Sequence, residues 1–182
     1  MSGPGSARLF VAVDPPVAVR EQLAGWARAA LGVSGPRLIG VDGLHLTLCF
    51  LGHRPVAEID AVAKLALGCA MPVPELELGA PVWLPRRRPR VLAVEVRDPS
   101  GGLQELHSAV GEALASGAGY EPERRRFRPH VTVARMRAGS TAPRELDATP
   151  GLAFDAEALT LYRSRLARAG ASYEPLARVA LS

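Results

Sequence analysis

Cysteine and long apolar runs are scarce in this sequence of 182 residues. The two cysteines, Cys49 and Cys69, lie inside apolar segments, and their spacing fits neither a C-x-x-C redox motif nor a zinc-binding motif. A chain of this length buries enough apolar surface to fold without disulfide bonds. We therefore expect a reduced, cytoplasmic, monomeric protein with one domain over residues 1–182.

A membrane-spanning segment is also missing from the sequence pattern. No apolar window approaches the length that crosses a bilayer, and the first residues, MSGPGSARLFVAVDPP, lack a cationic start followed by an apolar run. We expect neither secretion nor membrane insertion.

Lysine is nearly absent, since Lys64 is the only one, and the formal net charge of +4 comes from arginine. Arginine grips phosphate with a planar fork, so arginine clusters suit a nucleic acid or nucleotide partner. A coding bias that replaces lysine by arginine on ordinary surface explains the same pattern, and both readings stay open. The two clusters are Arg86, Arg87, Arg88 and Arg90, and Arg124, Arg125, Arg126 and Arg128.

A strand, a helix, a connection and a strand with an H-x-T motif follow one another twice along the chain. The first copy covers a strand at 8–14, a helix at 17–31 and a strand at 45–52; the second covers a strand at 91–98, a helix from about 103 to 114 and a strand at 130–136. The remaining expected elements are a helix at 56–69 and strands at 75–84, 152–163 and 173–181. This repeat predicts an α+β fold of two duplicated β-α-β lobes, with helices outside and two antiparallel sheets facing across a central groove.

Strand alternation assigns the side chains of the first H-x-T strand, HLTLCFLG, to two faces. His45, Thr47 and Cys49 share one face, and Leu48 and Phe50 belong to the core side. One H-x-T strand alone is weak evidence, but two copies at equivalent points of a repeat would bring both polar faces to one groove.

Two imidazoles in one groove suit phosphoryl transfer. One ring removes a proton from the incoming oxygen and the other protonates the leaving oxygen, because the histidine pKa of about 6.5 permits both protonation states near neutral pH. His45 and His130 are the candidates, and the hydroxyls of Thr47 and Thr132 can donate to phosphate oxygens. A metal site is the competing use, but no third ligand has matching spacing. We therefore expect no metal and no cofactor.

The pair HLTLCFLG and RPHVTVAR, with RLFVAVD before it and LYRSRL after it, resembles the two-histidine (2H) phosphoesterases. Within them it is most similar to the RNA 2',3'-cyclic phosphodiesterases of the LigT/ThpR type, once called 2'-5' RNA ligases. The resemblance implies a bilobal LigT-like fold, His45 and His130 as acid and base, and phosphate binding by Thr47 and Thr132.

The resemblance also implies that Arg135 binds phosphate. Simple alternation puts Arg135 on the core face, so we expect a bend or bulge that turns it to the groove. Phe50, Arg128 and Tyr162 are candidate groove or RNA contacts.

The function expected from these features is metal-independent hydrolysis of a terminal ribose 2',3'-cyclic phosphate to a 2'-phosphomonoester. RNA ends or nucleotides that carry the cyclic phosphate are then the partners. Two alternatives stay open: 2'-5' RNA ligation or hydrolysis of other small 2',5'-linked or cyclic nucleotides, and a non-catalytic module that binds RNA ends.

Overall fold

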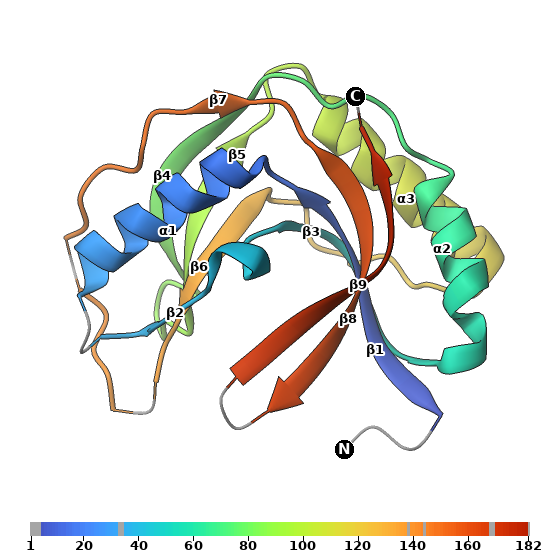
Figure 1. Ribbon diagram of the computed structural model, residues 1–182, viewed down its shortest axis with the longest axis horizontal. Helices are drawn as coiled ribbons and strands as arrows, with labels where there is room; N and C mark the ends of the chain where they lie inside the picture. Colours follow the sequence, from blue (N-terminus) through green and yellow to red (C-terminus); the bar gives the residue numbers. More distant parts are fainter. Residues whose placement is uncertain (1–4, 33–34, 138, 144, 168–169, 182) are drawn as a thin grey trace.

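The computed structural model describes residues 5–32, 35–137, 139–143, 145–167 and 170–181. Three α-helices, two short 3-10 helices and nine strands make up this part of the chain (Figure 1). In chain order they are β1 (Ser6–Asp14), α1 (Val17–Leu31), β2 (Arg37–Leu38), η1 (Val41–Gly43), β3 (Leu46–Pro55), η2 (Val56–Glu58), α2 (Ile59–Leu67), β4 (Leu76–Leu84), β5 (Val91–Arg97), α3 (Gly102–Ala118), β6 (His130–Arg135), β7 (Ala153–Phe154), β8 (Ala158–Ala167) and β9 (Gly170–Ala180). None of the helices in these residues has the length and apolar character needed to span a membrane.

The strands form two antiparallel arms. The path runs β7-β4-β5-β6-β3-β1-β8-β9, and β2 pairs with β6 at one side. β3 and β6 share one residue pair, Leu46 with Val131. We call β3, β1, β8 and β9 the first arm, and β6, β5, β4 and β7 with β2 the second arm. The predicted α+β class is confirmed, and the two expected sheets are arms of one continuous sheet that meet at this pair.

The arms do not follow the two halves of the sequence. β4 follows the first H-x-T strand but pairs with β5, and β8 follows the second H-x-T strand but pairs with β1. The helices cross as well, because α1 packs against β6 and β2 while α3 packs against β3. Each sequence repeat therefore contributes to both arms. The assignment of residues 1–182 to a single domain stays a prediction.

One expected element is wrong. The strand predicted over 152–163 is two strands, because β7 pairs with β4 in the second arm whereas β8 pairs with β1 in the first. The residues between them carry the chain from one arm to the other. The short β2 was not expected, since it lies in a segment broken by glycine and proline.

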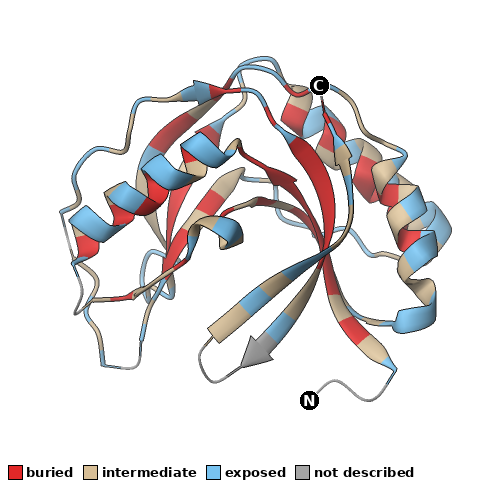
Figure 2. Cartoon of the chain, in the orientation of Figure 1, coloured by how far each residue is buried: buried red, intermediate tan, exposed pale blue. Residues whose placement is uncertain are grey.

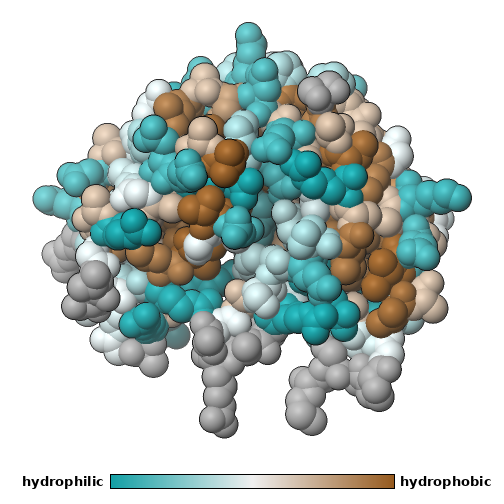
Figure 3. All heavy atoms as spheres, in the orientation of Figure 1, coloured by the Kyte–Doolittle hydropathy of each residue, from teal (hydrophilic) through white to brown (hydrophobic). Residues whose placement is uncertain are grey.

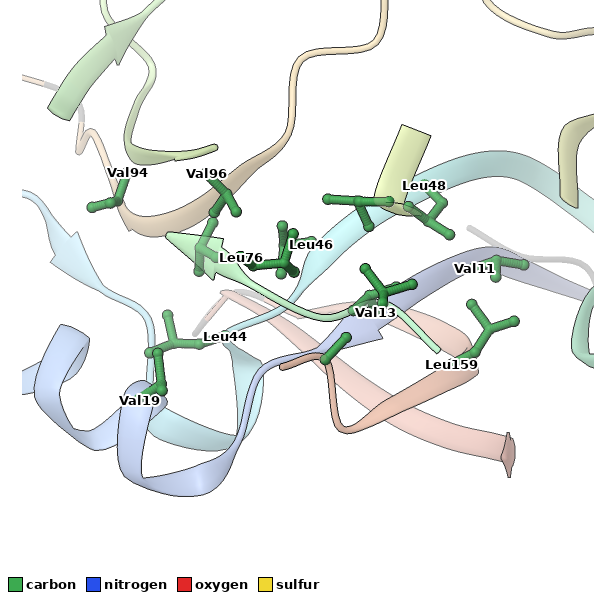
Figure 4. Packing of buried hydrophobic residues seen from close by; sticks show 14 of the residues in the cluster. Val11, Val13, Val19, Leu44, Leu46, Leu48, Leu76, Val94, Val96 and Leu159 are labelled. Carbon is green, nitrogen blue, oxygen red and sulfur yellow. The ribbon is translucent and has the colours of Figure 1, made fainter. Parts of the chain in front are cut away.

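The core lies between the helices and one face of the arms. Alternate residues of β1, among them Val11 and Val13, are fully buried and pack with Leu46 and Leu159 (Figure 4). Burying a side chain of this size stabilises the fold by about 1.5–3 kcal/mol. Figure 2 shows that burial runs through the central strands and decreases toward the β8–β9 hairpin.

The opposite face of β1 carries a second, smaller apolar cluster. Phe10, Ala12 and Tyr162 are buried there, with Tyr173 packed against them. We call the sheet face that carries Phe10 and Ala12 the site face. Figure 3 shows that hydrophilic side chains gather over the centre of the molecular face seen there, between apolar areas on both sides.

Candidate active site

A bulge in β3 determines where the side chains of the first H-x-T strand point. Thr47 pairs with Ala12 and Cys49 pairs with Val11, so Leu48 is an extra residue with no partner on β1. Thr47 therefore lies on the site face, whereas Cys49 lies with Val11 on the core face. The alternation pattern was wrong for Cys49, which is fully buried in the main core.

Burial raises the pKa of the Cys49 thiol to about 11. The thiol is protonated at neutral pH, which suits a small core residue and not a nucleophile or a metal ligand. Cys49 is therefore not a groove residue.

The same bulge reverses the expectation for Phe50. Phe50 pairs with Phe10 on the site face, and 54% of its surface is exposed, so its assignment to the core side is wrong. The two rings lie 6.0 Å apart between centroids. Phe50 is thus placed on the face where a groove contact was proposed for it.

β6 contains the equivalent bulge. Thr132 pairs with Ala93 and Ala134 pairs with Leu92, which leaves Val133 as an extra residue with no partner on β5. Arg135 then pairs with Val91, two residues from Ala93 along β5, and so returns to the face of Thr132. The bulge expected from the sequence is present, and it turns Arg135 to the site face.

The junction of the arms brings the two motifs together. Because Leu46 and Val131 are directly paired in an antiparallel ladder, the residues that flank them project from the opposite face of the sheet. Continuing this register sets His45 opposite Thr132, and Thr47 opposite His130. The junction therefore lies at the centre of the four polar side chains.

Aromatic rings surround His45. Its ring lies 4.8 Å from Phe10, 5.7 Å from Tyr162 and 4.9 Å from Tyr173, between centroids. Burial lowers the pKa of His45 to about 4, and the nearby charges of Arg135 and His130 act in the same direction, against a hydrogen bond with the Gly43 backbone. His45 is therefore neutral at pH 7 in the free protein.

His130 has a more open and polar environment. Its Nδ1 lies 2.8 Å from the carbonyl oxygen of Arg128. A carbonyl oxygen only accepts, so Nδ1 carries a hydrogen and Nε2 is left for a substrate. Glu95 is the β5 partner of His130. The guanidinium of the exposed Arg128 lies 3.5 Å from the Glu95 carboxylate. Arg128 thus contributes a backbone acceptor to His130 as well as a charge near the site.

Tyr173 connects the two arms across the site, and the sequence pattern did not single it out. Its hydroxyl accepts a hydrogen bond of 3.3 Å from Arg135 of the second arm, while its ring meets His45 edge-on. The arms also come close together where Gly170 of β9 faces Arg37 of β2, because a Cβ added to Gly170 would overlap the Arg37 guanidinium. The arms therefore touch on the site side of their junction as well.

Tyr162 is a neighbour of His45, and its hydroxyl binds the buried carboxylate of Asp14. It donates 2.8 Å to Asp14, whose other oxygen accepts 2.7 Å from Thr160, and Asp14 is 5% exposed. Burial, and then the Asp14 carboxylate, raise the pKa of Tyr162. The ring is thereby braced against His45. Asp14 was also missed, because alternate residues of β1 read as an apolar strand.

The arginine clusters lie outside this constellation. Arg86, Arg87, Arg88 and Arg90 are exposed around the connection from β4 to β5, and Arg124, Arg125, Arg126 and Arg128 are exposed before β6. Phe127 holds the second cluster against α3, since its ring stacks on His107 at 4.0 Å. In the described residues no three side chains of histidine, cysteine, aspartate or glutamate group closely enough to hold a metal ion.

Curated relatives align with almost the whole chain. An RNA 2',3'-cyclic phosphodiesterase of Escherichia coli (strain K12) is 34% identical over 179 residues, which cover 96% of this chain and 97% of the relative. An RNA 2',3'-cyclic phosphodiesterase of Thermus thermophilus is 30% identical over 188 residues, with coverages of 96% and 90%.

Solved structures agree with this similarity. LigT of E. coli in complex with 3'-AMP superposes with a TM-score of 0.81 at 32% identity, over 97% of this chain and 99% of LigT. A protein of T. thermophilus gives a TM-score of 0.82 at 28% identity, over 96% and 97%. The LigT-like fold expected from the sequence is therefore confirmed. A family described as the 2'-5' RNA ligase superfamily matches residues 15–168, and the chain thus belongs to that superfamily, which confirms the resemblance carried by the two H-x-T motifs.

Proposed function

We propose that this protein hydrolyses the 2',3'-cyclic phosphate at RNA ends to a 2'-phosphomonoester, by acid–base catalysis with His45 and His130. The observation that carries the proposal is the register at the junction of the arms, where both histidines and both threonines flank the Leu46–Val131 pair on one face. The names of the aligned relatives point to the same activity.

The reaction needs no group beyond these side chains and water. A neutral imidazole takes a proton from water as the water oxygen attacks phosphorus. The bond from phosphorus to the ribose 3'-oxygen breaks, and the second imidazole, which is protonated, gives its proton to that oxygen. Thr47, Thr132 and Arg135 are proposed to donate to the non-bridging phosphate oxygens, where negative charge gathers. We propose no metal and no cofactor.

The assignment of acid and base is a separate question. The sequence leaves the roles of acid and base open between His45 and His130, and the lowered pKa of His45 opposes the acid role for it in the free protein. His45 can act as acid only if the bound phosphate anion restores its proton. A substrate whose leaving 3'-oxygen is replaced by sulfur separates the roles, because a thiolate leaves without a proton from a general acid. The alanine variant of the acid should recover most of its lost rate on this substrate, whereas the variant of the base should not.

The decisive test uses defined substrates. The protein is incubated with each 2',3'-cyclic nucleotide and with an oligonucleotide that ends in a cyclic phosphate, with and without EDTA, and the position of the phosphate in the product is determined. We expect 2'-phosphate products and no effect of EDTA. Absence of turnover on every substrate, or complete loss with EDTA, would contradict the proposal.

Ligation is the second candidate, because the superfamily description includes it and the same two proton transfers serve when a 5'-hydroxyl replaces water as the attacking group. Supplying a 5'-hydroxyl RNA together with the cyclic-phosphate RNA measures both reactions, and we expect hydrolysis to dominate in dilute solution. A non-catalytic RNA-end binding module would instead retain salt-sensitive binding without turnover.

We also propose a monomer in the cytoplasm. Both cysteines are free, and burial raises the pKa of each thiol, as suits a reducing compartment. Sedimentation of the 19.2 kDa chain tests the monomer.

A further inference from the structure

The site face continues beyond the catalytic constellation along β1 and β3. A second bulge, with Leu51 as the extra residue, keeps the next side chain of β3 on this face: Phe50 pairs with Phe10, and His53 pairs with Arg8. The β1–β8 ladder has no shift over the same stretch, so Arg8 and Phe10 project from one side of β1. Two bulges thus place residues 47, 50 and 53 in line on one face.

These residues form a surface that starts at His45. Phe10 lies against the His45 ring, Phe50 lies against Phe10, and the Arg8–His53 pair follows one pleat repeat, about 7 Å, farther along the strands. His53 is an exposed residue within β3.

The chemistry of this surface fits a single RNA strand. Phe50 is the most exposed large apolar side chain among the described residues, and a flat exposed ring stacks on nucleobases. No ion pair involves Arg8 in the described chain, so its guanidinium is not neutralised by a carboxylate. Two rows of paired residues cross β3, β1, β8 and β9 on this surface, and none of their residues is acidic. In that strand order, one row is Phe50, Phe10, Tyr162 and Pro175, and the other is His53, Arg8, Ser164 and Tyr173.

We propose that this surface binds the RNA strand on the 5' side of the cyclic phosphate. Phe50 stacks on the terminal nucleobase, and Arg8 and His53 hold the phosphate that links the terminal nucleotide to the preceding one. The inference rests on the proposed function and deepens it: the natural substrate class is an oligonucleotide end, and a cyclic mononucleotide lacks the linking phosphate.

The test compares Arg8→Gln with a matched control, Arg163→Gln. Arg163 pairs with Leu9, so it lies on the same pair of strands but projects from the opposite face. The kcat/KM is measured for a 2',3'-cyclic mononucleotide and for a cyclic-phosphate trinucleotide. We expect Arg8→Gln to lower kcat/KM for the trinucleotide roughly tenfold at low salt. The slope of log kcat/KM against log salt concentration should become less steep by about 0.7, which is the contribution of one phosphate contact. The mononucleotide value should change less than twofold, and Arg163→Gln should change neither.

His53→Gln provides a second variant at an exposed position, with thermal melting as the check of folding. Fluorescence anisotropy with a labelled trinucleotide ending in 2'-phosphate measures binding without turnover. Equal trinucleotide kinetics and affinity for the wild type, Arg8→Gln and Arg163→Gln would overturn the inference. If the wild type hydrolyses neither substrate, the proposed function fails, and the anisotropy comparison still decides whether this surface binds RNA.

Discussion

The two H-x-T strands have the same motif and an equivalent bulge, yet their histidines lie in different surroundings. His45 is enclosed by the rings of Phe10, Tyr162 and Tyr173, while His130 lies near Glu95 and an exposed arginine. The first arm therefore favours a neutral imidazole. A duplicated fold thus supplies two copies of one side chain, and the later elements that pair with each copy make them chemically different.

The source of the difference is the exchange of strands between the repeats. In the first arm, β8 pairs with β1 and β9 lies beyond β8, and these two strands bring in Tyr162 and Tyr173. In the second arm, β4 takes the equivalent place beside β5, and only the two-residue β7 lies beyond it. Two of the three rings that enclose His45 therefore come from the last part of the chain, outside both H-x-T motifs.

The largest expected effect comes from removing either histidine. His45→Ala and His130→Ala should each lower kcat by about 10²–10⁴-fold, because each proton transfer needs its own imidazole. Steady-state kinetics on a cyclic nucleotide, with circular dichroism to confirm folding, checks this. Retention of most activity in one variant would mean that one arm suffices, and the two-histidine mechanism would be wrong.

A smaller effect is expected from the threonines, and it tests whether the arms share the phosphate equally. Thr47→Val and Thr132→Val keep the side-chain shape and remove the hydroxyl, so each should lower kcat by roughly 10- to 100-fold. Thr47→Ser and Thr132→Ser are the matched controls and should recover most of the rate. Equal rates for the Val and Ser variants at one position would show that its hydroxyl does not contact the phosphate.

Strand alternation predicted the face of His45, Thr47 and Thr132, because all three precede the bulge in their strand. It failed for Cys49 and Phe50, which follow the first bulge, since one unpaired residue reverses the face of the later side chains up to the next bulge. Arg135 was placed correctly only because the family resemblance required a bulge. The contacts of Asp14 with Tyr162 and of Tyr173 with His45 join residues more than a hundred positions apart, and no local pattern contains them.

The stability of the protein in acid tests the enclosure of His45. The pKa of His45 is about 4 in the folded protein, below its ordinary value of 6.5, so the unfolded chain binds one more proton between these values. The free energy of unfolding should therefore decrease as pH falls through this window, by on the order of 2 kcal/mol from this residue. Urea denaturation of the wild type and His45→Gln measures the contribution. The prediction fails if the difference between the two proteins stays constant from pH 7 to pH 4.

The smallest effect concerns Cys49 and Phe50, which the first bulge of β3 places on opposite faces from those that alternation predicts. Cys49→Ala should destabilise the protein by about 1 kcal/mol, because it removes a fully buried sulfur from the core. Phe50→Leu should stay within about 0.5 kcal/mol, since more than half of the ring surface is already exposed. Urea midpoints of both variants test the register directly, because uninterrupted alternation predicts the reverse order. The two variants should also separate in function: Cys49→Ala keeps full activity, whereas Phe50→Leu raises KM because the flat ring is lost from the site face.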